Sequence, residues 1–184
     1  MRSIRLLAAG ATTVVLVFCS AVAVMAQEEA EEGPSPYLFG EVEGFLHHNA
    51  ENPLGCDIGF TSDTTGTGTS TLLGATTLSA RNCYVPTDTY QNMTNVVMTL
   101  TGETGDVLEF EGRTGNCLPD MTTEAGGVFT CPGTVVVTGG SGAFEGASGE
   151  IHTVAYTTNA EAKQPDAVPG DAPFRMIFEG LIDY

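Results

Sequence analysis

The sequence predicts an all-β protein, and three observations carry this prediction. Apolar and polar residues alternate with a period of two over several stretches, as they do in strands with one face in a core. Turns containing glycine, proline and asparagine separate these stretches. Beyond the first 26 residues, no stretch has the period of an amphipathic helix. Many short strands with regular turns indicate a β-barrel or a β-sandwich.

Residues 1–26 have the order of a secretory signal peptide. Arg2 and Arg5 precede an apolar run, and Val24 and Ala26 occupy the positions where a signal peptidase accepts small side chains. We expect cleavage before Gln27 and secretion, either to the extracellular space or to the periplasm.

Two alternatives to cleavage stay open at this point. Residues 6–25 are long enough to be retained as a membrane anchor. Cys19 would allow a lipoprotein, but Phe18 stands where a small residue is needed. Residues 27–36, QEEAEEGPSP, lack the apolar residues that would offset the entropy of ordering, so we expect a disordered acidic arm. Residues 37–184 then make up a single domain.

The charge of the chain excludes some classes of partner. The formal net charge is −17, and removing Arg2 and Arg5 with the signal peptide changes it from −17 to −19. We therefore expect no binding to nucleic acid, which depends on Lys and Arg neutralising phosphates, and no binding to membranes after cleavage. The simplest role of the acidity is solubility.

Residues 37–48 alternate strictly and predict the first strand. If the face with Glu41 and Glu43 points into a barrel, these carboxylates and Tyr37 are the candidate catalytic residues, with pKa values raised by burial. In the alternative, the face with the leucines and valine is inside and the carboxylates face water.

Aromatic and histidine side chains supply the remaining candidates. Phe39 and Phe45 in the first strand, with Phe178 in the last, are the candidate ligand-binding residues. His47 and His48 point to opposite faces of a strand, so both cannot directly join one set of metal ligands. We expect no metal site and no cofactor.

Later stretches predict further strands and loops. Residues 61–70, TSDTTGTGTS, are polar and of low complexity, and we expect a long turn or a frayed edge strand there. In a hairpin spanning residues 95–112, the apolar residues of both arms would pack together, with Glu109 and Glu111 toward solvent. The expected strands are residues 37–48, 56–60, 71–81, 95–101, 107–112, 134–138, 150–156 and 173–184, with loops at 82–95, 113–125 and 157–172.

Residues 134–156 predict a strand, a glycine corner and a second strand. The corner glycines permit a tight reversal, because glycine adopts positive φ without a steric cost, and Phe144 can fill the end of a core. A phosphate-binding loop would need a helix behind it, whereas residues 150–156 alternate as a strand does. We therefore predict that the corner is architectural. Its defining residues are Gly139, Gly140, Gly142, Phe144, Gly146 and Gly149.

The corner sequence GGSGAFEGASGEI at residues 139–151 resembles the GGSG-x-F-x-G-x-x-G segment of plant allene oxide cyclases. It is still more similar to the GGTGRFAGATG segment of secreted bacterial proteins in the same barrel superfamily, which dirigent proteins also join. Residues 102–108, residues 73–78 with Cys83, and residues 178–182 resemble the AANGDTLTG, HLGRFT…C and F-x-G-x-I segments of the bacterial members. The resemblance implies a small antiparallel eight-stranded β-barrel with a structural corner. It implies no activity.

Four cysteines follow the signal peptide, and an even number in an exported chain indicates two disulfides. Three pairings are possible. We predict Cys117–Cys131, which closes a short loop leading to the corner strand, and Cys56–Cys83, which ties the early strands together. No Cys-x-x-Cys pair occurs, which argues against a zinc site or thioredoxin-like chemistry.

Three functions from different classes are compatible with the sequence. The first is a secreted barrel that binds a small apolar ligand in the lumen or at its mouth. The second is an isomerase or cyclase that acts on a small lipid-like substrate, as the plant enzymes do. The third is an acidic extracellular structural or interaction domain without lumen chemistry. An open, dry lumen would favour the first, a buried carboxylate in an open lumen the second, and a lumen packed with Phe, Met and Leu the third.

Overall fold

The computed structural model describes residues 36–49, 53–56, 60–86, 91–120, 128–158 and 171–184. The predicted signal peptide and all but the last residue of the predicted acidic arm lie outside these ranges. The strands are β1 (Tyr37–Asn49), β2 (Phe60–Ser70), β3 (Gly74–Pro86), β4 (Gln91–Gly102), β5 (Val107–Asp120), β6 (Val128–Ser141), β7 (Ser148–Thr158) and β8 (Ala172–Asp183), with a short 3₁₀ helix, η1 (Gly142–Phe144), between β6 and β7.

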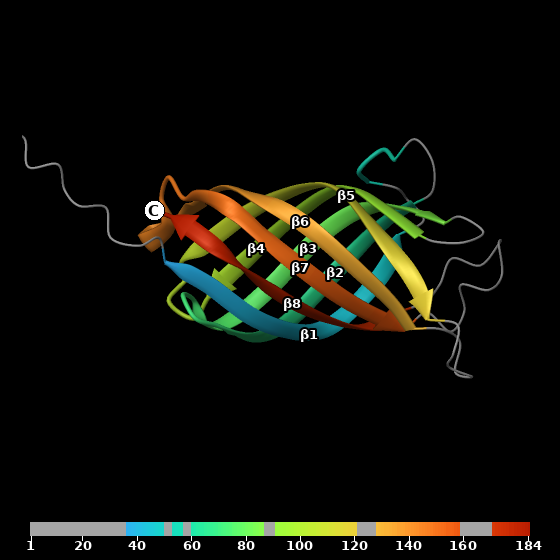
Figure 1. Ribbon diagram of the computed structural model, residues 1–184, viewed down its shortest axis with the longest axis horizontal. Coiled ribbons are helices and arrows are strands. Elements are labelled where there is room, and N and C mark those ends of the chain that lie inside the picture. Colours follow the sequence, from blue (N-terminus) through green and yellow to red (C-terminus); the bar gives the residue numbers. More distant parts are fainter. Residues whose placement is uncertain (1–35, 50–52, 57–59, 87–90, 121–127, 159–170) are drawn as a thin grey trace, which may run out of the picture. The chain divides into compact units, whose positions relative to one another are not determined.

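The strands form a closed antiparallel barrel in chain order, with β8 pairing back onto β1 (Figure 1). The closing pair runs from Tyr37 opposite Leu181 to Leu46 opposite Ala172. Closure removes the free edges that an open sheet would expose to other chains. The prediction of an all-β, eight-stranded antiparallel barrel is confirmed.

One set of alternating residues faces the lumen and the other faces outward. In β1 the lumen face carries Leu38, Val42 and Leu46, and in β8 it carries Phe174, Met176, Phe178 and Ile182. The predicted hairpin forms between β4 and β5, where Leu100 lies opposite Leu108 and Met98 opposite Phe110. These residues belong to a continuous apolar core.

The structure corrects three sequence-based boundaries. Residues 61–70 are not a turn or a frayed edge but most of β2, which pairs along its length with both β1 and β3. Most of the predicted strand at 56–60 lies outside the described residues; Cys56 precedes β2, and Phe60 begins it. β3 and β5 also extend into residues expected to be loops, to Pro86 and Asp120. In each case a polar segment becomes a strand because neighbours on both sides satisfy its backbone hydrogen bonds.

The two ends of the barrel differ in how the strands are connected. At one end, which we call the corner end, strands are joined by residues 71–73, 103–106 and 142–147, and the chain also enters β1 and leaves β8 there (Figure 1). At the other, the loop end, the connections are residues 50–59, 87–90, 121–127 and 159–171.

The glycine corner closes the corner end. Phe144 is 2% exposed, and its ring packs edge-on against Tyr184 with centroids 4.7 Å apart. The carboxylate of Asp106, in the β4–β5 turn, accepts a hydrogen bond of 2.9 Å from the Ala143 amide. Gly142 has a φ of 68°, and a Cβ there would lie 2.0 Å from Asp106 Oδ1, so only glycine fits this position.

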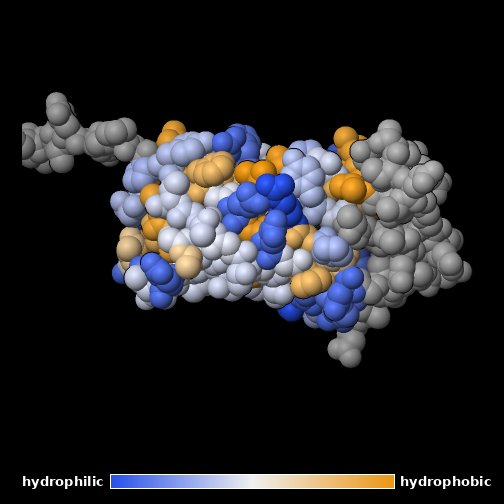
Figure 2. Space-filling model, turned by 90° about the horizontal axis from the view of Figure 1, so that it is seen from below, coloured by the Kyte–Doolittle hydropathy of each residue, from blue (hydrophilic) through white to orange (hydrophobic). Residues whose placement is uncertain are grey.

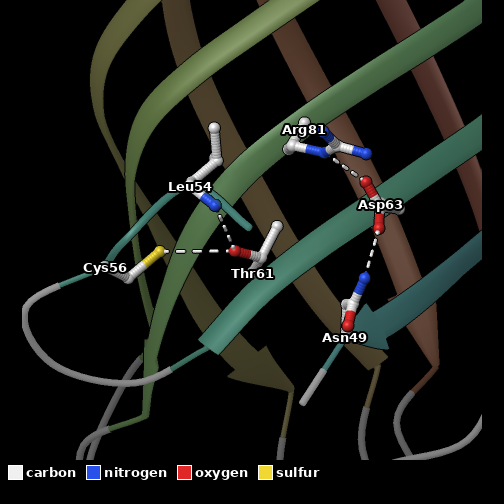
Figure 3. Close-up of polar contacts among 6 residues, drawn as sticks. All are labelled: Asn49, Leu54, Cys56, Thr61, Asp63 and Arg81. Atoms are coloured by element: carbon white, nitrogen blue, oxygen red, sulfur yellow. Dashed lines mark hydrogen bonds and ion pairs between the residues drawn. The ribbon is translucent and has the colours of Figure 1, made fainter. Parts of the chain in front are cut away.

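Both predicted disulfides, Cys56–Cys83 and Cys117–Cys131, are formed. The first ties residues 53–56 to β3. Those residues also bond to β2, where Thr61 Oγ1 accepts from the Leu54 amide at 3.2 Å and lies 3.7 Å from Cys56 Sγ (Figure 3). Thr61 and Cys83 are consequently buried, although each is on the outward face of its strand.

The outer surface carries ion pairs and scattered apolar side chains. Asp63 on β2 bridges Arg81 on β3 and Asn49 on β1 (Figure 3). On the face seen in Figure 2, hydrophobic residues are dispersed among hydrophilic ones and do not form one large apolar area. In the described residues, no helix has the length and apolar character to cross a bilayer.

Candidate functional site

The lumen is filled at the corner end and keeps a cavity nearer the loop end. Leu100, Leu108, Phe110, Ile151 and Phe178 are at most 1% exposed and pack the corner half. A cavity of about 70 Å³ remains beyond them. Its apolar lining includes Leu46, Leu78, Ala80, Met93, Met98, Ala155, Phe174 and Met176, and its polar lining includes Thr64, Asn82, Thr134 and Thr153.

A belt of buried polar side chains occupies the lumen at the loop end. We call these residues the polar belt; they lie on the lumen face of their strands, and register places His48 opposite Ser62 and Ser62 opposite Asn82. The ring of His48 contacts that of Tyr84, with centroids 4.7 Å apart. The members are His48 on β1, Ser62 and Thr64 on β2, Asn82 and Tyr84 on β3, and Thr157 on β7, and each is at most 8% exposed.

Hydrogen bonding within the polar belt is incomplete. Ser62 Oγ and Thr157 Oγ1 are buried and have no hydrogen-bond partner among the described residues. Asn82 donates to the Cys83 carbonyl at 3.3 Å. Buried hydroxyl groups usually find a partner, because an unsatisfied one costs about 1–3 kcal/mol. The belt therefore offers hydrogen bonds to a bound molecule.

His48 is uncharged at neutral pH. Burial, together with the smaller effect of the neighbouring His47 charge, lowers its pKa from 6.5 to about 4. A neutral imidazole has one N–H donor and one acceptor nitrogen. The polar belt therefore presents hydrogen-bonding groups without a formal charge at pH 7.

An outer groove of about 1390 Å³ runs over β4–β7 on the outside of the barrel. Outward residues of these strands line it, among them Glu111, Val136, Glu150 and His152. Leu54 lies at its margin, held there by its backbone hydrogen bond to Thr61. Thr134 Oγ1 and His152 Nδ1 are 3.2 Å apart across the β6–β7 pair.

The three candidate catalytic residues lie outside the lumen. Tyr37 is 49% exposed and donates its hydroxyl to Glu179 at 2.6 Å, which raises its pKa. Glu41 accepts a hydrogen bond from Arg175, and that bond lowers the pKa of Glu41. Glu43 lies 4.0 Å from the same guanidinium. Acid–base catalysis inside a barrel would require an inward carboxyl with a raised pKa. None of these three residues provides one.

The candidate ligand-binding residues are likewise not brought together. Phe39 and Phe45 are 46% and 60% exposed on the outside of β1. Phe45 lines a second outer hollow, of about 530 Å³, with Tyr156 and Pro173. Phe178 is in the lumen, but its ring covers Gly40 in the packed half, where a Cβ would lie 2.3 Å from the ring. It does not line the cavity.

The polar belt was missed by sequence reasoning. The period-two pattern of β1 puts His48 on the same face as Leu46. That pattern was the one indication in the sequence that His48 faces the lumen. Ser62, Asn82 and Tyr84 fall in stretches that were expected to be turns, so no face was assigned to them. Among the described residues, no group of three or more His, Cys, Asp and Glu side chains is arranged to bind a metal ion.

The fold is thus that of a small closed antiparallel β-barrel. No protein-family model matches the chain, and no curated protein matches it. Two chains of solved structures match. One is the pterocarpan synthase dirigent protein GePTS1, with a TM-score of 0.40 and 18% sequence identity over 83% of this chain and 88% of that chain. No residue role is carried over from this match.

Proposed function

We propose that this barrel binds a small molecule in the loop-end half of its lumen, with a short apolar group in the cavity and a hydrogen-bonding group toward the polar belt. One observation carries the proposal. The corner half is filled by large apolar side chains, whereas the loop-end half combines a cavity of about 70 Å³ with buried polar groups. Apolar linings with a few placed polar groups are typical of ligand sites.

The lining of the cavity favours a ligand over permanent emptiness. Met93, Met98 and Met176 all line it. Methionine side chains are unbranched and adapt to the shape of what they contact. The cavity is small, so a short alkyl chain fits it better than an extended lipid. Asn82, which belongs to both the cavity lining and the polar belt, connects the two parts of the proposed site.

Methyl NMR tests the proposal directly. Protein with ¹³C-labelled methionine methyl groups is titrated with n-butanol and, separately, with benzene. We expect the methyl signals of the three cavity methionines, assigned by single substitution, to shift with saturation. If neither probe moves these signals at millimolar concentration, the cavity does not take ligands and the proposal is wrong.

Substitution of the lining provides the control. Ala155 lines the cavity and is 9% exposed, so Ala155→Leu should fill the space and abolish the shifts. Ala75 is exposed on the outer face of β3, and Ala75→Leu adds the same atoms without entering the lumen. Met98→Ala should enlarge the cavity and so tighten the binding of benzene. The same substitution should lower the free energy of unfolding by about 2–5 kcal/mol.

A second candidate function has some support. The filled corner half and the net charge of −17 fit an acidic extracellular interaction domain without lumen chemistry. Absence of any probe binding would favour it. The isomerase alternative gains no support, since no carboxylate is buried among the described residues. The two disulfides fit an oxidising compartment, which supports the proposal that the protein is secreted.

A further inference from the structure

The barrel wall is irregular between β5 and β6. Regular pairing reaches Glu111 opposite Val136 and resumes only with Gly115 opposite Gly133. The adjoining β4 strand is irregular at the same level, where Asn95 has a φ of 52°. Bulges of this kind break the hydrogen-bond ladder and bend the strand locally. The wall of the lumen is therefore interrupted at this place.

Glycine keeps the interrupted wall thin. Gly112, Gly115 and Gly133 stand at lumen-facing positions there and line both the cavity and the outer groove. Val96, Thr134 and Thr153 also line both. Among the side chains that the structure describes here, only small ones, with the backbone, separate the outer groove from the lumen cavity.

Two carboxylates stand in the outer groove beside this thin wall. Strand register places Glu111, Val136 and Glu150 in one row across β5, β6 and β7. All three face outward, and Val136 is 49% exposed between the two acids. Two interstrand spacings separate the glutamates, roughly 10 Å between Cα atoms, so both side chains can approach one group bound over Val136.

We propose that the outer groove and the lumen cavity form one site for an amphiphilic cation. Its short alkyl chain passes the thin wall into the cavity, and its ammonium or other cationic group stays in the groove between Glu111 and Glu150. This inference rests on the proposed function for the occupied cavity. For a cationic ligand it places the polar head in the outer groove instead of at the polar belt, and it adds the charge class and the route through the β5–β6 wall.

The electrostatics favour a cation over the alternatives. The described residues that line the groove include the two carboxylates and no Lys or Arg; the side chain of Arg113, on β5, is outside the described set. A carboxylate or phosphate head would meet Glu111 and Glu150 as like charges. A neutral head would gain hydrogen bonds from residues such as Thr134 but no ion pair. The chain as a whole, at −17, attracts cations.

A series of probes with one chain and three heads tests the inference. The methionine methyl signals are followed in titrations with n-butylammonium, n-butanol and n-butyrate at about 20 mM ionic strength. We expect n-butylammonium to bind most tightly and n-butyrate least, with the advantage of n-butylammonium falling as salt is added. Equal affinities for the three heads, or tighter binding of n-butyrate, would overturn the inference while leaving ligand binding itself in place.

Variants locate the cationic head. Glu111→Gln and Glu150→Gln should each weaken n-butylammonium about two- to fivefold, the range for exposed ion pairs, and leave n-butanol unchanged. Glu145→Gln, an exposed corner residue, removes the same charge elsewhere and should change neither. An equal loss in Glu145→Gln would mean that only the overall field attracts the probe, which contradicts the assigned position.

A variant of the wall tests the route. A Cβ at Gly133 would meet only Thr153 Oγ1, at 3.0 Å, so Gly133→Val fills the wall with little disturbance of the backbone. We expect it to weaken n-butylammonium at least tenfold and n-butanol much less, because n-butanol can lie wholly inside the cavity. Unchanged binding of n-butylammonium would exclude the route. Gly133→Ala is a smaller change and should weaken n-butylammonium binding to an intermediate extent. It keeps the test valid if the valine variant does not fold.

Discussion

Phe144 is the buried aromatic side chain of the glycine corner. Its ring is 2% exposed and belongs to the apolar core, although the corner around it is exposed. Phe144→Ala should lower the free energy of unfolding by about 3–5 kcal/mol, as for other buried aromatic residues. Urea unfolding gives the value.

Ser141 supplies the comparison for Phe144. It is exposed, and its side chain makes no capping hydrogen bond to η1. Ser141→Ala should therefore leave stability and any probe binding within error of the wild type. An unchanged unfolding midpoint in Phe144→Ala, or lost binding in a folded Ser141→Ala, would contradict the architectural role of the corner.

His48 makes the stability of the barrel depend on pH. Its pKa is about 4 in the folded state against 6.5 ordinarily, so between these values the unfolded chain binds a proton that the folded chain does not. The contribution of His48 to the free energy of unfolding is fully present above pH 6.5 and is lost as the pH decreases toward 4. The loss reaches about 3 kcal/mol, from 1.36 kcal/mol for each pH unit.

The contribution of His48 can be isolated by comparing variants. Unfolding of wild type and His48→Gln is measured by urea titration at pH 7 and pH 4.5. The wild type should lose more stability between the two pH values than His48→Gln, which has no imidazole at this position to protonate. A parallel decline in both proteins would show that groups other than His48 govern the acid response.

At the scale of elements, the Cys56–Cys83 disulfide links the β1–β2 connection to β3. It closes a sequence separation of 27 residues, for which the loss of unfolded-chain entropy predicts a stabilisation of about 3.5 kcal/mol. The double variant Cys56→Ala/Cys83→Ala should unfold at a correspondingly lower urea concentration. It should also expose Thr61, which residues 53–56 now cover, and hydrogen exchange of the Leu54 amide reports this change.

The strands also show how much of the fold could be predicted from the sequence. Alternation in β4, β5 and β8 is strong, because large apolar residues alternate with polar or charged ones, and it separated the two faces of those strands correctly. In β1 alternation separated the two faces but left open which of them is inside. β2 has no such contrast: Ser62 and Thr64 face the lumen and Thr65 faces out. A strand of small polar residues is stabilised by pairing with β1 and β3, and that pairing is not visible in its own composition.

The candidate site was harder to predict than the fold for a related reason. The polar belt is assembled from β1, β2, β3 and β7, and the cavity from strands spread over the whole chain. No local motif marks residues that meet only when β8 closes onto β1. The exposed acids Glu41 and Glu43 were conspicuous in the sequence, but Arg175 pairs with them on the outside.

At the scale of the whole molecule, the excess of negative charge should destabilise the barrel at low salt. At −17, or −19 for the chain from Gln27, like charges repel more in the compact state than in the unfolded one. Raising the ionic strength from about 0.01 M to 0.15 M shortens the screening length from about 30 Å to 8 Å, and the urea midpoint should rise.

The opposing effect of salt is smaller. Screening also weakens surface ion pairs such as Arg81–Asp63 and Arg175–Glu41, but each exposed pair contributes only about 0–1 kcal/mol. Repulsion among many acids should therefore dominate. A midpoint that falls with added salt would mean that the ion pairs, and not the net charge, control stability.

The pairing of β8 with β1 also determines from which end the barrel can be attached to a surface or to another protein. The Ile182 amide donates to the Pro36 carbonyl at 3.0 Å, so the beginning and the end of the barrel are direct neighbours at the corner end. A tether attached at Pro36 or at Tyr184 therefore holds the barrel by the same end and presents the opposite end, with its polar belt, outward. The two ends are also near enough to be joined by a short linker, and a circular permutant opened between β5 and β6 would keep all eight strands in place.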